Sequence, residues 1–96
     1  MQYYFDYKPE DNIGVLTLYC PNCRKKQSLF FNSKTVQMYS SANGWYQQAP
    51  ISIKCNECVS LIVHENEMET IIGLLRLGGF AAMSKGLAEL WTLLED

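Results

Sequence analysis

Alternating hydrophobic and polar positions dominate the first two thirds of the chain and predict short β-strands. Residues 3–7 and 13–19 are rich in aromatic and β-branched side chains, and Pro9-Glu10-Asp11-Asn12 between them has the composition of a turn. These residues predict an N-terminal β-hairpin. Asn43-Gly44 predicts a tight turn farther along. Additional strands are predicted at residues 27–31, 36–39, 45–47, 51–54 and 59–64.

After Glu65 the spacing of hydrophobic residues becomes helical. Asn66 followed by Glu69 has the form of a capping box, and Gly78-Gly79 is expected to end this helix. Ser84 is an alternative N-cap for a second helix. The hydrophobic stripes, spaced by three and four residues, run through Met68, Ile72 and Leu75 and then through Phe80, Met83, Leu87, Leu90 and Leu94.

Together these patterns predict an α+β fold in one domain that spans residues 1–96. Residues 1–64 form a small antiparallel β part with the N-terminal hairpin, and residues 65–96 form a helical hairpin packed on it. A composition that is 48% hydrophobic and 12% aromatic belongs to a folded chain with a small core, not to a disordered one.

The chain shows no export or membrane signal, so we expect a cytoplasmic protein without a membrane partner. Its N-terminus lacks the basic and continuously apolar segments of a secretory signal. The most apolar stretch, residues 71–94, is interrupted by Arg76, Lys85 and Glu89 and by paired glycines. A reducing compartment favours metal binding over disulfides for paired cysteines.

The charges are strongly segregated although the formal net charge is only -2. Residues 57–96 are acidic overall, whereas residues 20–56 contain no acid. The near-neutral total therefore excludes a uniformly basic surface but not a local basic one. The basic residues of the middle segment are Arg24, Lys25, Lys26, Lys34 and Lys54.

The clearest motif is a pair of Cys-x-x-Cys sequences. Cys20-Pro21-Asn22-Cys23 follows one predicted strand and Cys55-Asn56-Glu57-Cys58 follows another. Two residues between thiolates allow a tight turn to aim both sulfurs at one point, and two such turns supply the four tetrahedral ligands that zinc prefers. The four cysteines, Cys20, Cys23, Cys55 and Cys58, are therefore the predicted metal ligands.

This arrangement resembles the zinc-ribbon superfamily, in which two Cys-x-x-Cys knuckles at the ends of β-hairpins clamp one zinc ion. The resemblance covers about residues 13–64 and implies a structural Zn²⁺. Family knuckles often carry glycine directly after the second cysteine, where this chain has Arg24 and Val59. A β-branched Val59 is strained at positive φ, which predicts a second knuckle of a different shape.

Two alternatives to zinc remain open. In the first alternative the thiols are free or form redox disulfides, but the doubled spacing and the expected compartment favour a metal. Rubredoxins are similar in cysteine spacing and hold iron for one-electron transfer with the same four-sulfur cage. Sulfur geometry alone does not separate these two metals.

No constellation for catalysis is visible, so we expect a non-enzymatic protein without a small-molecule substrate. Four thiolates close the coordination shell, whereas a catalytic zinc keeps one position open for water. His64 is the only histidine and is interpreted as an ordinary strand residue. The chain has no Gly-rich phosphate loop and no HExxH sequence.

Binding to a protein partner or to a second copy through the helices is the favoured function. The first predicted helix is apolar around most of its circumference, and such a helix is buried on more than one side. If the fold itself does not cover these residues, they form an interface. The interface candidates are Ile71, Leu74, Leu75, Leu87, Leu90 and Trp91.

Nucleic-acid binding is the alternative function. The basic residues of the middle segment would follow a phosphate backbone, and exposed Trp45 or Tyr46 would stack on bases. The competing interpretation is that the lysines balance a dianionic thiolate site and that the aromatic residues fill the core.

Overall fold

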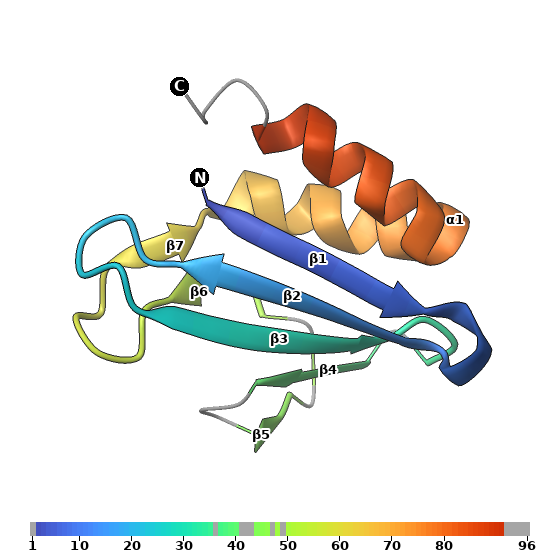
Figure 1. The fold of residues 1–96 in the computed structure, drawn as a ribbon, viewed down its shortest axis with the longest axis horizontal. Coiled ribbons are helices and arrows are strands. Elements are labelled where there is room, and N and C mark those ends of the chain that lie inside the picture. The colour runs from blue at the N-terminus through green and yellow to red at the C-terminus, as the bar shows by residue number, and fades with distance from the viewer. Residues whose placement is uncertain (1, 36, 41–43, 47, 49, 92–96) are drawn as a thin grey trace.

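A computed structural model of the chain, which describes residues 2–35, 37–40, 44–46, 48 and 50–91, contains a five-stranded antiparallel sheet. The strands follow one another in sequence order, so each pairs with its neighbours in the chain (Figure 1). They are β1 (Tyr3–Lys8), β2 (Ile13–Tyr19), β3 (Lys26–Asn32), β4 (Gln37–Ser40) and β5 (Gly44–Trp45).

The predicted N-terminal hairpin is confirmed. β1 and β2 pair from Tyr3 opposite Leu18 to Lys8 opposite Ile13. A single 3-10 turn, η1 (Pro9–Asp11), joins them, and Asn12 closes this turn in the left-handed region with φ 58. Asparagine tolerates that conformation better than most residues, which explains why the turn is made here.

The two faces of this sheet differ in burial because side chains alternate along each strand. We call the face that packs against the rest of the chain the inner face and the opposite one the outer face. The buried inner-face residues include Leu16, Leu18, Leu29, Phe31 and Met38.

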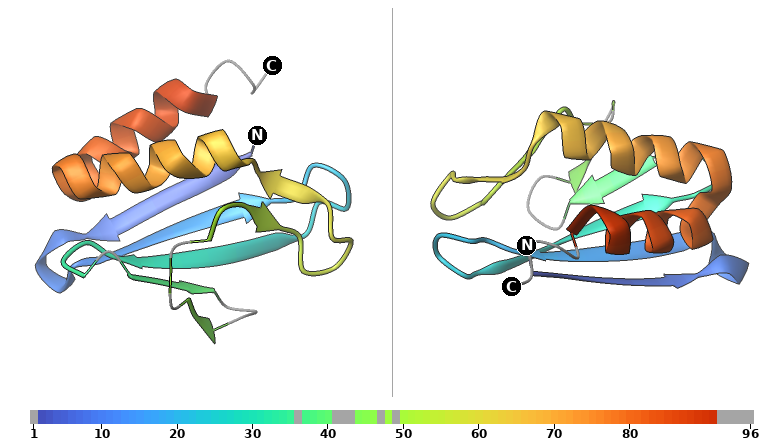
Figure 2. Two further views of the ribbon diagram at one scale, coloured as in Figure 1. Left: turned by 180° about the vertical axis from the view of Figure 1, so that it is seen from behind. Right: turned by 90° about the horizontal axis from the view of Figure 1, so that it is seen from above.

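A second, two-stranded sheet and a helix cover the inner face (Figure 2). The second sheet consists of β6 (Ile53–Lys54) and β7 (Leu61–Val63), with an irregular register. The helix, α1 (Glu65–Trp91), follows β7 directly. The core therefore lies between the five-stranded sheet on one side and α1 with the small sheet on the other.

The structure contains one helix where the sequence predicted a hairpin of two. α1 is a single assigned helix, but Gly79 inside it has φ 68 and ψ -150, a conformation reserved essentially for glycine. At this break α1 turns back on itself (Figures 1 and 2). We call residues 65–78 the first arm and residues 80–91 the second arm. Phe80 lies inside α1, so the alternative helix start at Ser84 is wrong.

The two arms pack against each other. A Cβ atom placed on Gly86 would collide with the methyl groups of Leu74, so the absence of a side chain at Gly86 leaves room for Leu74 of the first arm. Near the other end of the arms, the indole Nε1 of Trp91 donates a hydrogen bond of 2.7 Å to Oε2 of Glu67.

The N-cap of α1 lies two residues before the predicted one, at His64 instead of Asn66. The backbone N–H of His64 donates to Oε1 of Glu67 at 2.9 Å, and the helix begins at Glu65. Glu67 thus plays the part that the sequence analysis gave to Glu69. The pattern was ambiguous because glutamates occupy alternate positions at this end of α1.

The helical residues proposed as an interface lie mostly in the core, which corrects their assignment as surface contacts. Ile71, Leu75, Leu87 and Trp91 are at most 2% exposed, and Leu74 and Leu90 are partly buried against the same core. The reason is the turn at Gly79, because it lets each arm cover the apolar side of the other while both lie on the sheet.

By length and composition alone, α1 is apolar enough to cross a membrane. A bilayer span needs about 20 continuous helical residues. The break at Gly79 divides α1 into two arms that are each shorter than that.

Some predicted positions lie outside the described residues. They are Val36 and Gln47 at strand ends, Asn43 of the predicted tight turn, and Leu94 of the second helical stripe.

Candidate metal centre

The first cysteine pair lies in the turn between β2 and β3. The backbone N–H of Cys20 donates to the carbonyl of Lys25 at 2.9 Å, and the N–H of Arg24 donates to the carbonyl of Cys20 at 2.9 Å. Arg24 adopts φ 65. These bonds fold residues 20–25 into a tight knuckle at one end of the large sheet.

The second cysteine pair has the same backbone shape between β6 and β7. The N–H of Cys55 donates to the carbonyl of Ser60 at 2.8 Å, and the N–H of Val59 donates to the carbonyl of Cys55 at 3.1 Å. Val59 has φ 63, close to the value at Arg24. The prediction of a differently shaped second knuckle is therefore wrong, since Val59 adopts the left-handed conformation in spite of its branched side chain.

The two knuckles bring all four predicted ligands together. The Sγ atoms of Cys20, Cys23, Cys55 and Cys58 lie within 4.8 Å of one another. Two of these pairs join the knuckles, with 3.5 Å from Cys20 to Cys58 and 3.4 Å from Cys23 to Cys55. A tetrahedral zinc with Zn–S bonds of about 2.3 Å requires sulfurs about 3.8 Å apart. The cluster is compatible with a zinc-ribbon-like metal site.

Backbone N–H groups point at the sulfurs from inside each knuckle. Cys20 Sγ accepts from the N–H of Asn22 at 3.4 Å and from that of Cys23 at 3.5 Å. Cys55 Sγ accepts from the N–H of Glu57 at 3.4 Å. Such donors favour the thiolate form, which is the form that binds metals.

Three polar side chains connect the knuckles, and the sequence analysis missed all of them. The Nδ2 group of Asn22 donates to Ser60 Oγ at 3.3 Å, and Ser60 Oγ lies 3.3 Å from Cys58 Sγ. The buried Gln27 donates to the carbonyl of Lys54 at 3.2 Å and accepts from the N–H of Asn56 at 3.2 Å. A signal existed for Gln27 alone, because it is a polar residue at an inward position of an alternating strand.

The thiols differ in acidity. The Ser60 hydroxyl and N–H, together with the Asn22 side chain, lower the pKa of Cys58 to about 5. Backbone N–H groups of Cys58 and Glu57 lower the pKa of Cys55. The backbone at Lys25 acts to lower the pKa of Cys23, but burial and the neighbouring sulfurs outweigh it and raise that pKa to about 12. The hydrogen bonds at Cys58 and Cys55 therefore favour their thiolate forms, whereas the surroundings of Cys23 favour its thiol form.

Ser60→Ala should weaken zinc binding about tenfold at pH 7, in line with the usual effect of losing a hydrogen bond to a ligand. Without the hydroxyl the pKa of Cys58 rises from about 5 toward its ordinary value of 9.0, so protons compete with the metal. The difference in zinc affinity between the variant and the parent should shrink above pH 9, where the Cys58 thiol ionises in both proteins. Competition with a chromophoric chelator at several pH values measures this effect. Ser33→Ala, in the turn after β3, is the control, and equal affinities for the Ser60 variant and the parent at pH 7 would refute the role.

Val59→Gly should stabilise the metal-loaded protein. The left-handed conformation costs a branched residue about 1–2 kcal/mol, and glycine gives back roughly 0.5–1 kcal/mol through its freer unfolded chain. A net gain of about 0.5–1 kcal/mol is expected because Val59 is 65% exposed and loses little packing. Urea denaturation in excess zinc measures it. Val59→Ala, which keeps a Cβ, should gain less stability than Val59→Gly. A glycine variant that is less stable than the parent would contradict backbone strain at Val59.

The predicted nucleic-acid contacts are only partly brought together. Arg24, Lys25, Lys26 and Lys54 are exposed near the knuckles, and Lys25 lies 4.0 Å from Glu57 of the other knuckle. Lys34 is exposed in the turn at the opposite end of β3. Trp45 is 63% exposed, whereas Tyr46 is partly buried against the core.

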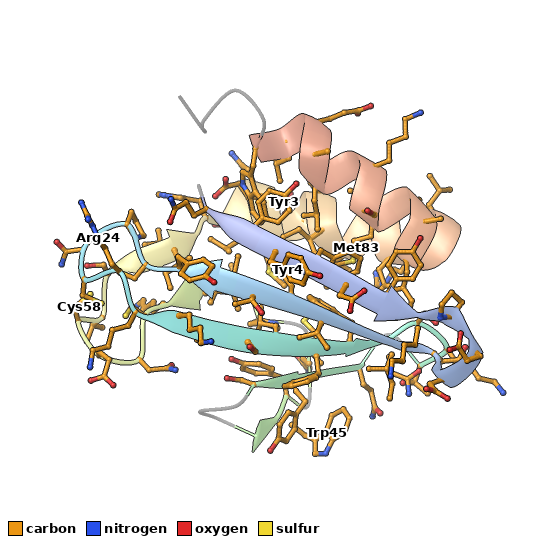
Figure 3. The ribbon with its side chains drawn as sticks, in the orientation of Figure 1. Tyr3, Tyr4, Arg24, Trp45, Cys58 and Met83 are labelled. Carbon is orange, nitrogen blue, oxygen red and sulfur yellow. The ribbon has the colours of Figure 1, made fainter. Side chains whose placement is uncertain are left out.

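In the orientation of Figure 3, Arg24 and Cys58 lie at the knuckle end of the sheet, and Trp45 lies on β5 away from it.

No protein-family model matches the chain, and neither the curated proteins nor the solved structures contain a match.

Proposed function

We propose that this chain holds one structural Zn²⁺ and acts as a non-enzymatic binding module. The observation that carries the proposal is the approach of four sulfur atoms from two like-shaped knuckles to within 4.8 Å. Zinc suits such a site because it takes four thiolates in a tetrahedron and has no redox chemistry of its own.

Cys20 and Cys23 would hold the ion from the large sheet, and Cys55 and Cys58 from the small one. The ion would supply a cross-link between two sheets that are otherwise joined near the site by few polar contacts. Four thiolates leave no position for a water nucleophile, which supports a structural rather than a catalytic role. Thiolate ligands also require a reducing compartment, so the proposal includes a cytoplasmic location.

Metal analysis of protein purified without added metal tests this assignment. One zinc per chain and a colourless solution are expected. A red protein that contains iron would support the rubredoxin-like alternative instead of zinc, because the same four-sulfur cage binds both metals. Protein with no metal and no zinc affinity would overturn the proposal altogether.

A module without catalysis acts by binding another molecule. The helical residues first considered for this purpose are mostly in the core, so we place the binding surface elsewhere on the fold. Among the described residues, several exposed large hydrophobic side chains lie together on the outer face of the five-stranded sheet.

A further inference from the structure

The outer face carries a row of side chains that crosses the whole sheet. Cα partners in the register connect Asp6 to Val15, Val15 to Phe30, Phe30 to Tyr39 and Tyr39 to Trp45. These residues share one face because directly opposite residues point the same way. We call Phe30, Tyr39 and Trp45, which come from β3, β4 and β5, the aromatic row.

The three rings of the aromatic row touch one another and remain accessible. The centroids of Phe30 and Tyr39 are 5.8 Å apart with an interplanar angle of 61°, and those of Tyr39 and Trp45 are 5.2 Å apart at 67°. Beside them lies a hollow of about 310 Å³, lined by Ile13, Phe30, Phe31, Asn32, Tyr39 and Trp45. This surface is apolar, open to solvent and shaped by flat rings.

The strands that carry the aromatic row contain no acid, and Asp6, on β1, lies two strands away from Phe30 in the same register. No acid occurs between Asp11 and Glu57, so β3, β4 and β5 and the turns between them contain none. Lys26 begins β3, and Lys34 follows its end in the turn to β4. β3 spans roughly 20 Å from Lys26 to Asn32 at about 3.3 Å per residue, and the exposed Lys34 follows two residues after its end. The row therefore lies between two positive charges.

We propose that the aromatic row binds single-stranded nucleic acid, with bases stacked on Phe30, Tyr39 and Trp45 and phosphates bound by Lys26 and Lys34. Stacking requires base faces that a duplex hides, and it accepts any base because every base has a flat π-face. Strands β3, β4 and β5, which contain no acid, and the lysines at the two ends of β3 complement a phosphate backbone. This inference rests on the proposed function in one respect, since the zinc site must fold the sheet that presents the row.

Trp45 is a direct reporter of such binding. The chain has two tryptophans, and Trp91 is fully buried while Trp45 is 63% exposed. Titration of zinc-loaded protein with unlabelled oligothymidylate or oligouridylate should quench the emission of Trp45. Fluorescence anisotropy of the same oligonucleotides, carrying a fluorescein label, gives the dissociation constants. Comparison of the DNA and RNA oligonucleotides shows which sugar is preferred. A duplex of the same length should bind much more weakly.

Trp45→Ala should weaken binding roughly tenfold, the usual effect of losing one stacking partner. Leu77→Ala removes another exposed large side chain, 86% exposed on α1, and should leave binding unchanged. The double variant Lys26→Ala/Lys34→Ala should lower the slope of log affinity against log salt by about 1.4, which corresponds to two phosphate contacts on a single strand. Arg76→Ala/Lys85→Ala removes the same charge from α1 and should leave the slope unchanged.

Metal content and circular dichroism of each sample separate the two proposals. Folded, zinc-loaded protein that binds no single strand would overturn the inference and leave the zinc module intact. Equal binding by the Trp45 variant would also overturn it. Light scattering after size exclusion provides the remaining test, since it measures the oligomeric state. If the parent protein is a dimer and the Trp45→Ala variant is a monomer, the aromatic row binds a second copy of the chain instead.

Discussion

Cys55→Ser should unfold the small sheet and much of the fold around it. β6 and β7 contain two and three residues, and a two-stranded hairpin of that size is not stable by itself. Structural zinc sites contribute about 10–16 kcal/mol at neutral pH, as much as the whole stability of a typical domain. Loss of one ligand therefore removes the main support of β6 and β7, whose buried residues Ile53, Ile62 and Val63 would be exposed.

Thermal melting followed by circular dichroism measures this effect, with and without a chelator. The parent protein should melt far lower after metal removal, and the Cys55 variant should melt low in either condition. Glu57→Ser changes an exposed residue of the same knuckle that is not a ligand and should melt like the parent. Unchanged melting after complete metal removal would show that the core alone holds the fold.

Glu67→Ala should cost about 2–4 kcal/mol of stability, because this one carboxylate serves two distant parts of α1. Oε1 accepts the N–H of His64 at the start of the first arm, and Oε2 accepts the indole N–H of Trp91 in the second arm. Loss of a helix N-terminal cap costs about 0.5–2 kcal/mol, and a buried donor without a partner costs about 1–3 kcal/mol. Trp91 is fully buried, so water does not replace the lost acceptor.

Chemical denaturation of the zinc-loaded protein measures this loss. Glu69→Ala, two residues farther along the same arm and exposed, is the matched control and should change stability by less than about 0.5 kcal/mol. If the two variants are equally stable, the Glu67 carboxylate does not tie the arms together.

The β part of the fold was predictable because its signals are local. Alternation along residues 13–19, the turn at Asn12 and the doubled cysteine spacing each act within a few residues, and the structure bears out the hairpin and the clustering of the cysteines. Gln27 shows the limit of such reasoning. Its inward position is visible in the pattern, but its bonds to the second knuckle depend on how two distant hairpins meet.

The helical part was less predictable because tertiary packing decides it. Hydrophobic residues around most of a helix indicate burial on more than one side, yet they do not say whether the partner is another protein or the same chain. Gly79 settles this by turning α1 back, so that Leu75 and Leu87 join one core. The capping residue was misplaced for a related reason, since the contact of Glu67 with Trp91 is invisible in the sequence.

The two knuckles also set the order in which the chain assembles. β1, β2 and β3 pair with their neighbours in sequence, so these contacts close short loops and are expected to form early. The metal ligands, in contrast, join residues 20–23 to residues 55–58, and that closure carries the larger entropy cost. We therefore expect the ligand set to be completed late in refolding, after the hairpins of the large sheet have formed.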